Sequence, residues 1–268
     1  MSAALLFYEN LAPLSSKDHV DLYVKSGNDY SFAKKTNSVP VMSVEMPAAS
    51  ADYPIVFAGN EKEVIPVCIL GIKDGQNMFV DDKGSWNATY VPAFVRRYPF
   101  VFSTSNNGES FTLCIDEEFS GCNKDGKGER LFDTDGERTQ YLDGVLNFVQ
   151  DYQTEFNRTQ AFCKKLLELD ILEPMHAQVT MSTGEKMSLA GFMAVSREKL
   201  KQLSAEDASE LLRNDGMELI FTHLHSMKNF NEMIKLGGLT ETDKAADSEK
   251  KPAAKKAKAK KSSADKTH

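Results

Sequence analysis

Short runs of β-branched and aromatic residues alternate with turn residues through the first 115 positions of the chain. Such runs, bounded by glycine, proline, asparagine and aspartate, are typical of strands. Asp-Gly and Lys-Gly steps at residues 73–76 and 81–84 supply the positive φ angles that tight hairpins require. We therefore expect an antiparallel sheet in this half of the chain. The predicted strands are residues 20–24, 39–46, 55–58, 64–71, 78–81, 100–104 and 110–115.

The apolar spacing becomes helical after a loop rich in glycine, aspartate and lysine at residues 117–138. A stripe through residues 139–172 fits one long helix or two shorter ones equally well, and Pro174 closes it. Another stripe at residues 217–234 predicts the last helix, which we expect to stop at residues 237–238, a Gly-Gly pair.

Shorter elements complete the pattern. Residues 177–181 and 187–196 indicate a hairpin. Ser204 is a good N-cap for a helix over residues 205–213, and Gly216 can cap its other end.

A further short helix is predicted at residues 89–97, where Pro92 suits a first turn and the Tyr98-Pro99 step ends it. The whole pattern predicts an α+β fold, with mainly antiparallel sheet in the N-terminal half and helices with a hairpin in the C-terminal half. We expect a single domain over residues 1–240.

Composition separates a tail from this body. Residues 241–268 hold nine lysines, five acidic residues and no aromatic residue, so we expect them to be disordered. The tail carries +4, and subtracting it from the net charge of -7 leaves -11 for the body. A lysine-rich segment of this kind can neutralise nucleic-acid phosphates, or it can simply offset the acidic body. The candidate phosphate contacts are Lys255, Lys256, Lys258, Lys260 and Lys261.

Several classes of protein are disfavoured. The first residues lack the basic segment of a signal peptide, and the longest apolar runs are far shorter than the ~20 residues that span a bilayer. The cysteines are widely spaced without a CxxC motif, so we expect reduced, mostly buried thiols and no zinc site. They are Cys68, Cys114, Cys122 and Cys163.

No motif dictates a metal site, a cofactor or a nucleophile. Asp133-Thr-Asp-Gly136 has oxygen ligands suited to calcium, but the later positions of a calcium loop are missing, and a turn explains the residues better. His223 and His225 are two positions apart, whereas metal pairs on helices are four apart. No serine lies in a Gly-x-Ser-x-Gly elbow. We predict no cofactor and name no catalytic residue.

Residues 84–100 are the most informative stretch, because they hold the only tryptophan and two adjacent arginines between aromatic residues. On a helix the two arginines point about 100° apart, so one of them can bind a carboxylate or lie on an aromatic face. This allows a pocket for an anion or a peptide terminus. Ordinary packing, with one arginine paired to an acidic residue, fits the same residues. The candidate binding residues are Trp86, Tyr90, Arg96, Arg97 and Tyr98.

The body resembles the bacterial SapC family over residues 40–236. The resemblance rests on Tyr53-Pro-Ile-Val-Phe57, Asn77-Met-Phe-Val-Asp81, Gly84-Ser-Trp86, Tyr90-Val-Pro-Ala93, Arg96-Arg-Tyr-Pro-Phe100, Leu131-Phe-Asp-Thr-Asp-Gly136, Glu168-Leu-Asp170 and Gly216. The family name refers to a surface layer, and the family is sometimes labelled a peptide-transport permease. That label conflicts with the missing membrane spans. The resemblance implies no agreed reaction and no catalytic residues.

We therefore expect a cytoplasmic, non-catalytic binding or accessory module whose partner is a small molecule, a peptide or a protein. On this hypothesis Arg97→Ala weakens association and leaves the melting temperature nearly unchanged. A structural protein of the surface layer or envelope, exported without a cleaved signal peptide, is one alternative. An enzyme whose site is assembled from scattered polar residues is another.

Overall fold

The computed structural model of the chain describes residues 6–25, 27–104, 110–181, 186–236 and 239–240. Its helices and antiparallel sheets confirm the α+β class, with strands mainly in the N-terminal half and helices with one hairpin in the C-terminal half. The predicted helix stop at residues 237–238 and the basic tail at residues 241–268 lie outside the described residues.

The largest sheet has six strands in the order β12-β10-β11-β4-β5-β3. Its centre is the hairpin β4–β5, in which Ile55 lies opposite Cys68 and Gly59 opposite Val64. The long hairpin β10–β11 joins this centre through Phe192 and Met193, which pair with β4. The strands are β3 (Ser38–Pro40), β4 (Ile55–Gly59), β5 (Val64–Ile69), β10 (Leu172–Met181), β11 (Lys186–Val195) and β12 (Leu239–Thr240).

Two smaller antiparallel sheets complete the strand content. One has the order β1-β7-β6 and the other β8-β2-β9. Their strands are β1 (Leu11–Pro13), β2 (Tyr23–Val24), β6 (Phe100–Thr104), β7 (Phe111–Asp116), β8 (Cys122–Asn123) and β9 (Glu129–Arg130).

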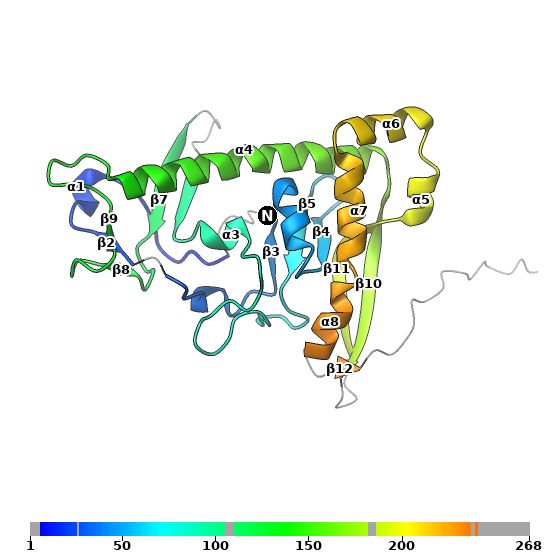
Figure 1. The fold of residues 1–268 in the computed structure, drawn as a ribbon, viewed down its shortest axis with the longest axis horizontal. Helices are drawn as coiled ribbons and strands as arrows, with labels where there is room; N and C mark the ends of the chain where they lie inside the picture. The colour runs from blue at the N-terminus through cyan, green and yellow to red at the C-terminus, as the bar shows by residue number, and fades with distance from the viewer. Residues whose placement is uncertain (1–5, 26, 105–109, 182–185, 237–238, 241–268) are drawn as a thin grey trace, which may run out of the picture.

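One long helix, α4 (Gln140–Glu168), runs along most of the length of the molecule (Figure 1). Its apolar side chains enter all three hydrophobic clusters of the protein: Leu142 and Val149 in one, Tyr152 in the second, Cys163 and Leu166 in the third. The helix therefore connects the three parts of the core.

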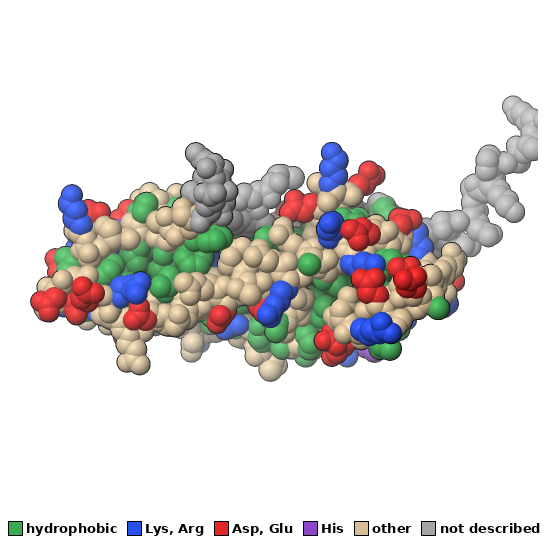
Figure 2. Space-filling model, turned by 90° about the horizontal axis from the view of Figure 1, so that it is seen from above, with side chains coloured by type: hydrophobic (Ala, Val, Ile, Leu, Met, Phe, Trp, Pro, Cys, Tyr) green, Lys and Arg blue, Asp and Glu red, His purple; other side chains and the backbone are tan. Residues whose placement is uncertain are grey.

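The other helices are short and lie around the sheets. They are α1 (Ser16–His19), α2 (Met46–Ala49), α3 (Ala93–Arg96), α5 (Arg197–Lys201), α6 (Ala205–Arg213), α7 (Gly216–Ser226) and α8 (Asn229–Leu236), with 3-10 turns η2 (Ser31–Ala33) and η3 (Ser43–Glu45). Viewed from the α4 side, acidic and basic side chains mix over the end that holds α5 and α6, and apolar side chains gather over the other half (Figure 2).

Four predictions in the first half are wrong in part. The strand expected at residues 20–24 is only the two-residue β2, because residues 20 and 21 form a turn after α1. The strand expected at residues 39–46 ends at Pro40, because the Glu45 side chain accepts a hydrogen bond from the Met42 backbone N–H (2.9 Å) and turns the chain into η3. Residues 78–81 form only a single bridge, between Val80 and Trp86. The helix expected at residues 89–97 is the single turn α3, because Pro92 has an extended ψ of 140° and acts as its N-cap.

The second half needs similar corrections. Residues 117–138 are not wholly loop, because β8 and β9 pair there with β2. The stripe at residues 217–234 is divided between α7 and α8. Gly216 does not cap α6 but begins α7, and the preceding Asp215 takes the positive φ of 60°.

Candidate contact site around the paired arginines

A one-turn helix presents the two arginines in different directions. Arg96 is the last residue of α3 and Arg97 is its C-cap. The turn is held at its start by Glu45, whose Oε1 accepts the Ala93 backbone N–H at 2.6 Å. Glu45 is only 5% exposed, so this carboxylate is an internal anchor for α3.

Arg97 points inward. It is 7% exposed, and its guanidinium carbon lies 4.3 Å from the ring centroid of Phe94 and 4.6 Å from that of Tyr152 on α4. The Tyr8 ring lies on the same guanidinium at 6.0 Å. Burial raises the pKa of Tyr8 to about 12, against the opposing effect of the Arg97 charge. Cation–π contacts of this kind are strongest when the cation is desolvated, so Arg97 ties α3 to α4.

Arg96 points outward and is exposed. Its Nε donates to the Val91 carbonyl at 2.9 Å, and its Nη2 donates to the Tyr90 hydroxyl at 3.2 Å. Its guanidinium carbon is 5.7 Å from the Tyr90 ring centroid and 5.2 Å from that of Phe148. Among the described residues, no carboxylate forms an ion pair with Arg96. The guanidinium is therefore both accessible and held in place.

Tyr90 connects this exposed cation to the interior. Its hydroxyl accepts from Arg96 and donates to Glu45 Oε1 at 2.7 Å, while its backbone N–H donates to Asp52 at 2.9 Å. Burial, followed by the hydrogen bond to Glu45, raises the pKa of Tyr90 to about 12. The phenol therefore stays neutral at physiological pH and can keep both hydrogen bonds.

Trp86 is half-buried and contacts this region from its inner side. Its indole N–H donates to the Tyr53 hydroxyl at 2.7 Å, and the Tyr53 hydroxyl donates to the Tyr90 carbonyl. The indole meets the Tyr30 ring edge-on at 5.5 Å. Trp86 thus fixes the backbone at Tyr90 from the inner side.

The hydroxyl and the ring of Tyr98 also make contacts within the protein. Its hydroxyl donates to Asp116 Oδ2 at 3.1 Å, and its ring packs on Phe32 at 4.3 Å and Phe119 at 5.2 Å. Asp116 is 0% exposed and also accepts the backbone N–H groups of Glu9 and Asn10. The carboxylate joins the N-terminal segment to the arginine region.

The structure places the five candidate residues around α3, and sequence reasoning missed Glu45 and Asp116. Glu45 lies within the predicted strand at residues 39–46, and Asp116 directly follows the one at residues 110–115. Their position within or beside an apolar run is the hint in the sequence that these carboxylates are buried, and a buried carboxylate needs internal partners. The sequence does not show that both partners come from α3 and its flanks.

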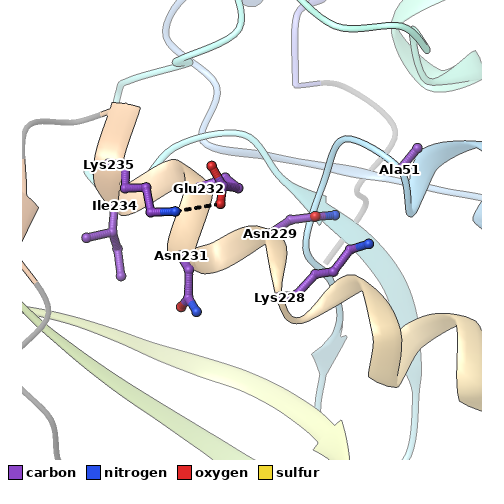
Figure 3. A pocket seen from close by; sticks show the side chains of 7 residues that line it. All are labelled: Ala51, Lys228, Asn229, Asn231, Glu232, Ile234 and Lys235. Carbon is purple, nitrogen blue, oxygen red and sulfur yellow. Dashed lines mark hydrogen bonds and ion pairs between the residues drawn. The ribbon is translucent and has the colours of Figure 1, made fainter.

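Elsewhere in the described part of the chain, a hollow lies beside α8 (Figure 3). It has a volume of about 600 Å³. Its lining residues are Ala51, Lys228, Asn229, Asn231, Glu232, Ile234 and Lys235. None of the five residues predicted to bind lies in this lining.

The remaining candidates from the sequence have structural partners. Asp133 Oδ1 accepts the backbone N–H groups of Asp135 and Glu137, both at 2.9 Å, as the turn interpretation requires. His223 is buried between strands, and His225 is exposed.

The four cysteines are free thiols, and burial is the largest cause raising the pKa of each, to about 11 for Cys122. The candidate lysines of the tail lie outside the described residues.

Comparison with known protein families matches residues 14–233 of the chain to SapC. The chain belongs to the SapC family. This match confirms the resemblance carried by the aromatic and arginine motifs of the sequence. No curated protein and no solved structure matches this SapC-family chain. Within the described residues, none of the helices has the length and apolar character needed to cross a bilayer.

Proposed function

We propose that this SapC-family protein is a non-catalytic binding module that captures a carboxylate group of its ligand with Arg96. The exposed yet immobilised guanidinium of Arg96 is the observation that carries the proposal. An arginine held by its own protein loses less conformational freedom on binding than a freely rotating one. The ligand is a peptide with a free carboxyl terminus or a small carboxylate.

The internal hydrogen bonds of Arg96 determine which N–H groups of its guanidinium are left to face the ligand. Nε and one N–H of Nη2 are directed to Val91 and Tyr90. A guanidinium carries five N–H donors in a planar fork, so the pair formed by Nη1 and the other N–H of Nη2 points to the outer side. That pair matches a carboxylate in a two-bond arrangement.

The other predicted binding residues take supporting roles in this proposal. Tyr90 positions Arg96 and offers its ring at the surface. Arg97, Trp86 and Tyr98 hold α3 and the Tyr90 backbone from the inner side. We therefore propose direct contact for Arg96 and Tyr90 and an indirect contribution for the other three.

A titration of the isotope-labelled full-length protein tests the proposal. The probes are the tripeptide Ala-Ala-Phe with a free carboxyl terminus, the same peptide as its amide, and acetate. We expect the free-acid peptide to shift the Arg96 Nε–H signal saturably, and the amide to bind about tenfold or more weakly. A shift with acetate as well assigns the site to carboxylates in general.

Two arginine variants supply the comparison. Arg96→Ala should abolish peptide binding, whereas Arg213→Ala, which removes another exposed helical arginine, should leave it unchanged. Binding of the amide as tight as that of the acid, or unchanged binding by Arg96→Ala, would contradict the proposal.

Tyr90→Phe tests the positioning role separately, because it removes the hydroxyl and keeps the ring. We expect affinity for the free-acid peptide to fall by about threefold to tenfold, since Arg96 loses one of its two internal hydrogen bonds. The pH dependence of binding should not change, because Tyr90 is neutral throughout the physiological range. Affinity equal to that of the unaltered protein would mean that Tyr90 does not position Arg96.

We place this binding activity in the cytoplasm, where reduced cysteines are the rule. The four free thiols of the structure support the proposal. Cell fractionation with an antibody to the intact chain tests it, and recovery in the envelope fraction would instead favour a structural role at the cell surface.

A further inference from the structure

The hollow beside α8 has the size of a small-ligand site. Its volume of about 600 Å³ falls within the range of pockets that hold metabolite-sized molecules. Ala51, at the end of α2, faces the first residues of α8 across it, and most of its lining is polar or charged (Figure 3). The hollow is separate in its residues from the Arg96 region, so it needs an occupant of its own.

Asn229 supplies a hydrogen-bond acceptor with a fixed orientation. The residue is only 4% exposed, and its Nδ2 donates to the backbone carbonyls of Ser50 (2.8 Å) and Tyr53 (3.0 Å). These two hydrogen bonds fix the orientation of the Asn229 side-chain amide, because only its nitrogen can donate to a carbonyl. Oδ1 must then face away from both carbonyls, and no described residue donates a hydrogen bond to it. Oδ1 is therefore the polar atom of this side chain that a hydrogen-bond donor of a ligand, or a water molecule, can reach from the hollow.

The charges around the hollow favour an anion. Glu232 and Lys235 neutralise each other through an ion pair of 2.8 Å, one turn apart on α8. Lys228 forms no ion pair with a described residue, and its side chain extends along the same side as that of Asn229 (Figure 3). The lining therefore has one cation in excess. This cation, Lys228, directly precedes Asn229 in the sequence.

We propose that this hollow binds a small hydroxycarboxylate, whose carboxylate pairs with Lys228 and whose hydroxyl donates to Asn229 Oδ1. A simple anion pairs with Lys228 and leaves water as the donor to Oδ1, and a neutral polyol donates to Oδ1 and leaves Lys228 without a counter-charge. A molecule with both groups satisfies both side chains at once. Ile234 and Ala51 add the apolar wall against which a short carbon chain can pack.

Three matched probes test the proposal on the isotope-labelled full-length protein. Racemic malate has both groups, succinate lacks the hydroxyl, and 1,2,4-butanetriol lacks the carboxylates. We expect malate to shift the Asn229 side-chain amide signals saturably, with about fivefold or greater weakening for succinate and for the triol. Equal affinity for malate and succinate, or no shift with malate, would overturn the proposal.

Variants that spare the hydrogen bonds of Asn229 complete the test. Lys228→Gln should weaken malate binding by about fivefold. Lys62→Gln, which removes another exposed lysine at the β4–β5 turn, should have no effect. Ala51→Leu should block binding by filling the hollow, since Ala51 is exposed and the protein should stay folded. Malate-induced shifts of the Asn229 side-chain amide that survive both Lys228→Gln and Ala51→Leu would place the ligand elsewhere. Because Arg96 can also bind malate through its carboxylates, the readout is the Asn229 signal, and its shifts should persist in Arg96→Ala whatever the outcome of the peptide experiment.

Discussion

At the scale of single residues, His223 shows how one side chain joins two strands and a helix. It lies on α7, its Nε2 accepts the Val195 backbone N–H at 3.0 Å, and its Nδ1 lies 2.7 Å from the Ile55 carbonyl. Only the neutral ring with the proton on Nδ1 satisfies both partners. Burial lowers the pKa of His223 to about 4.

The lowered pKa of His223 gives a defined pH dependence of stability. Above pH 6.5, the pKa of an unperturbed histidine, the His223 side chain is neutral in both the folded and the unfolded protein. Below pH 6.5 it is protonated in the unfolded protein and stays neutral in the folded protein until the pH nears 4. Stability should therefore fall as pH drops from about 6.5 to about 4, by about 3 kcal/mol in total. Histidine NMR signals measured between pH 8 and pH 5 should show the His223 ring unchanged. Titration of His223 near pH 6.5 would contradict this account.

The sequence predicts that Arg96 and Arg97 point apart, but not which of them is buried. Helical geometry alone fixes the angle between adjacent residues. The choice depends on where α4 lies, because Phe148 and Tyr152 receive the two guanidinium groups one turn apart. That is a long-range contact, so it cannot be inferred from residues 84–100.

At the scale of elements, local signals were sufficient where a helix or strand is determined by its own residues. Ser204 caps α6 as predicted, with its hydroxyl accepting the Asp207 N–H at 3.0 Å. The hairpin β4–β5 likewise matches two predicted strands, the short apolar runs at residues 55–58 and 64–71. The predictions that were wrong concern elements whose conformation depends on a distant partner. An example is the segment in which Glu45 turns away from the sheet and accepts a hydrogen bond from the Ala93 backbone N–H.

The start of α4 gives a prediction for one side chain. Thr139 Oγ1 accepts the Leu142 N–H at 3.3 Å and donates to the Arg130 carbonyl at 2.7 Å. Thr139→Ala should therefore lower the free energy of unfolding by about 1 to 2 kcal/mol, and Thr139→Ser, which keeps the hydroxyl, by much less. Urea unfolding of both variants measures this. Equal losses would mean that the methyl group, not the cap, is what stabilises the helix.

At the scale of the whole molecule, α4 takes part in all three hydrophobic clusters, so each cluster depends on the same helix. The single domain over residues 1–240 stays a prediction. Trp86, the only tryptophan, reports on one cluster, whereas far-ultraviolet circular dichroism reports on the whole fold. We expect both signals to follow one urea transition. Two separate transitions would show that the clusters fold as independent units.

Our central claim is that Arg97 stabilises the fold, whereas Arg96 is exposed and available to a ligand. Urea unfolding of the two variants Arg96→Ala and Arg97→Ala tests this difference most directly. Arg97→Ala removes a buried cation from between Phe94 and Tyr152, so it should lower the free energy of unfolding by about 2 to 4 kcal/mol. This replaces the expectation from the sequence that Arg97→Ala leaves the melting temperature nearly unchanged, because Arg97 is only 7% exposed. Arg96→Ala removes an exposed side chain and should cost about 1 kcal/mol or less. Equal losses, or a larger loss for Arg96→Ala, would contradict the account.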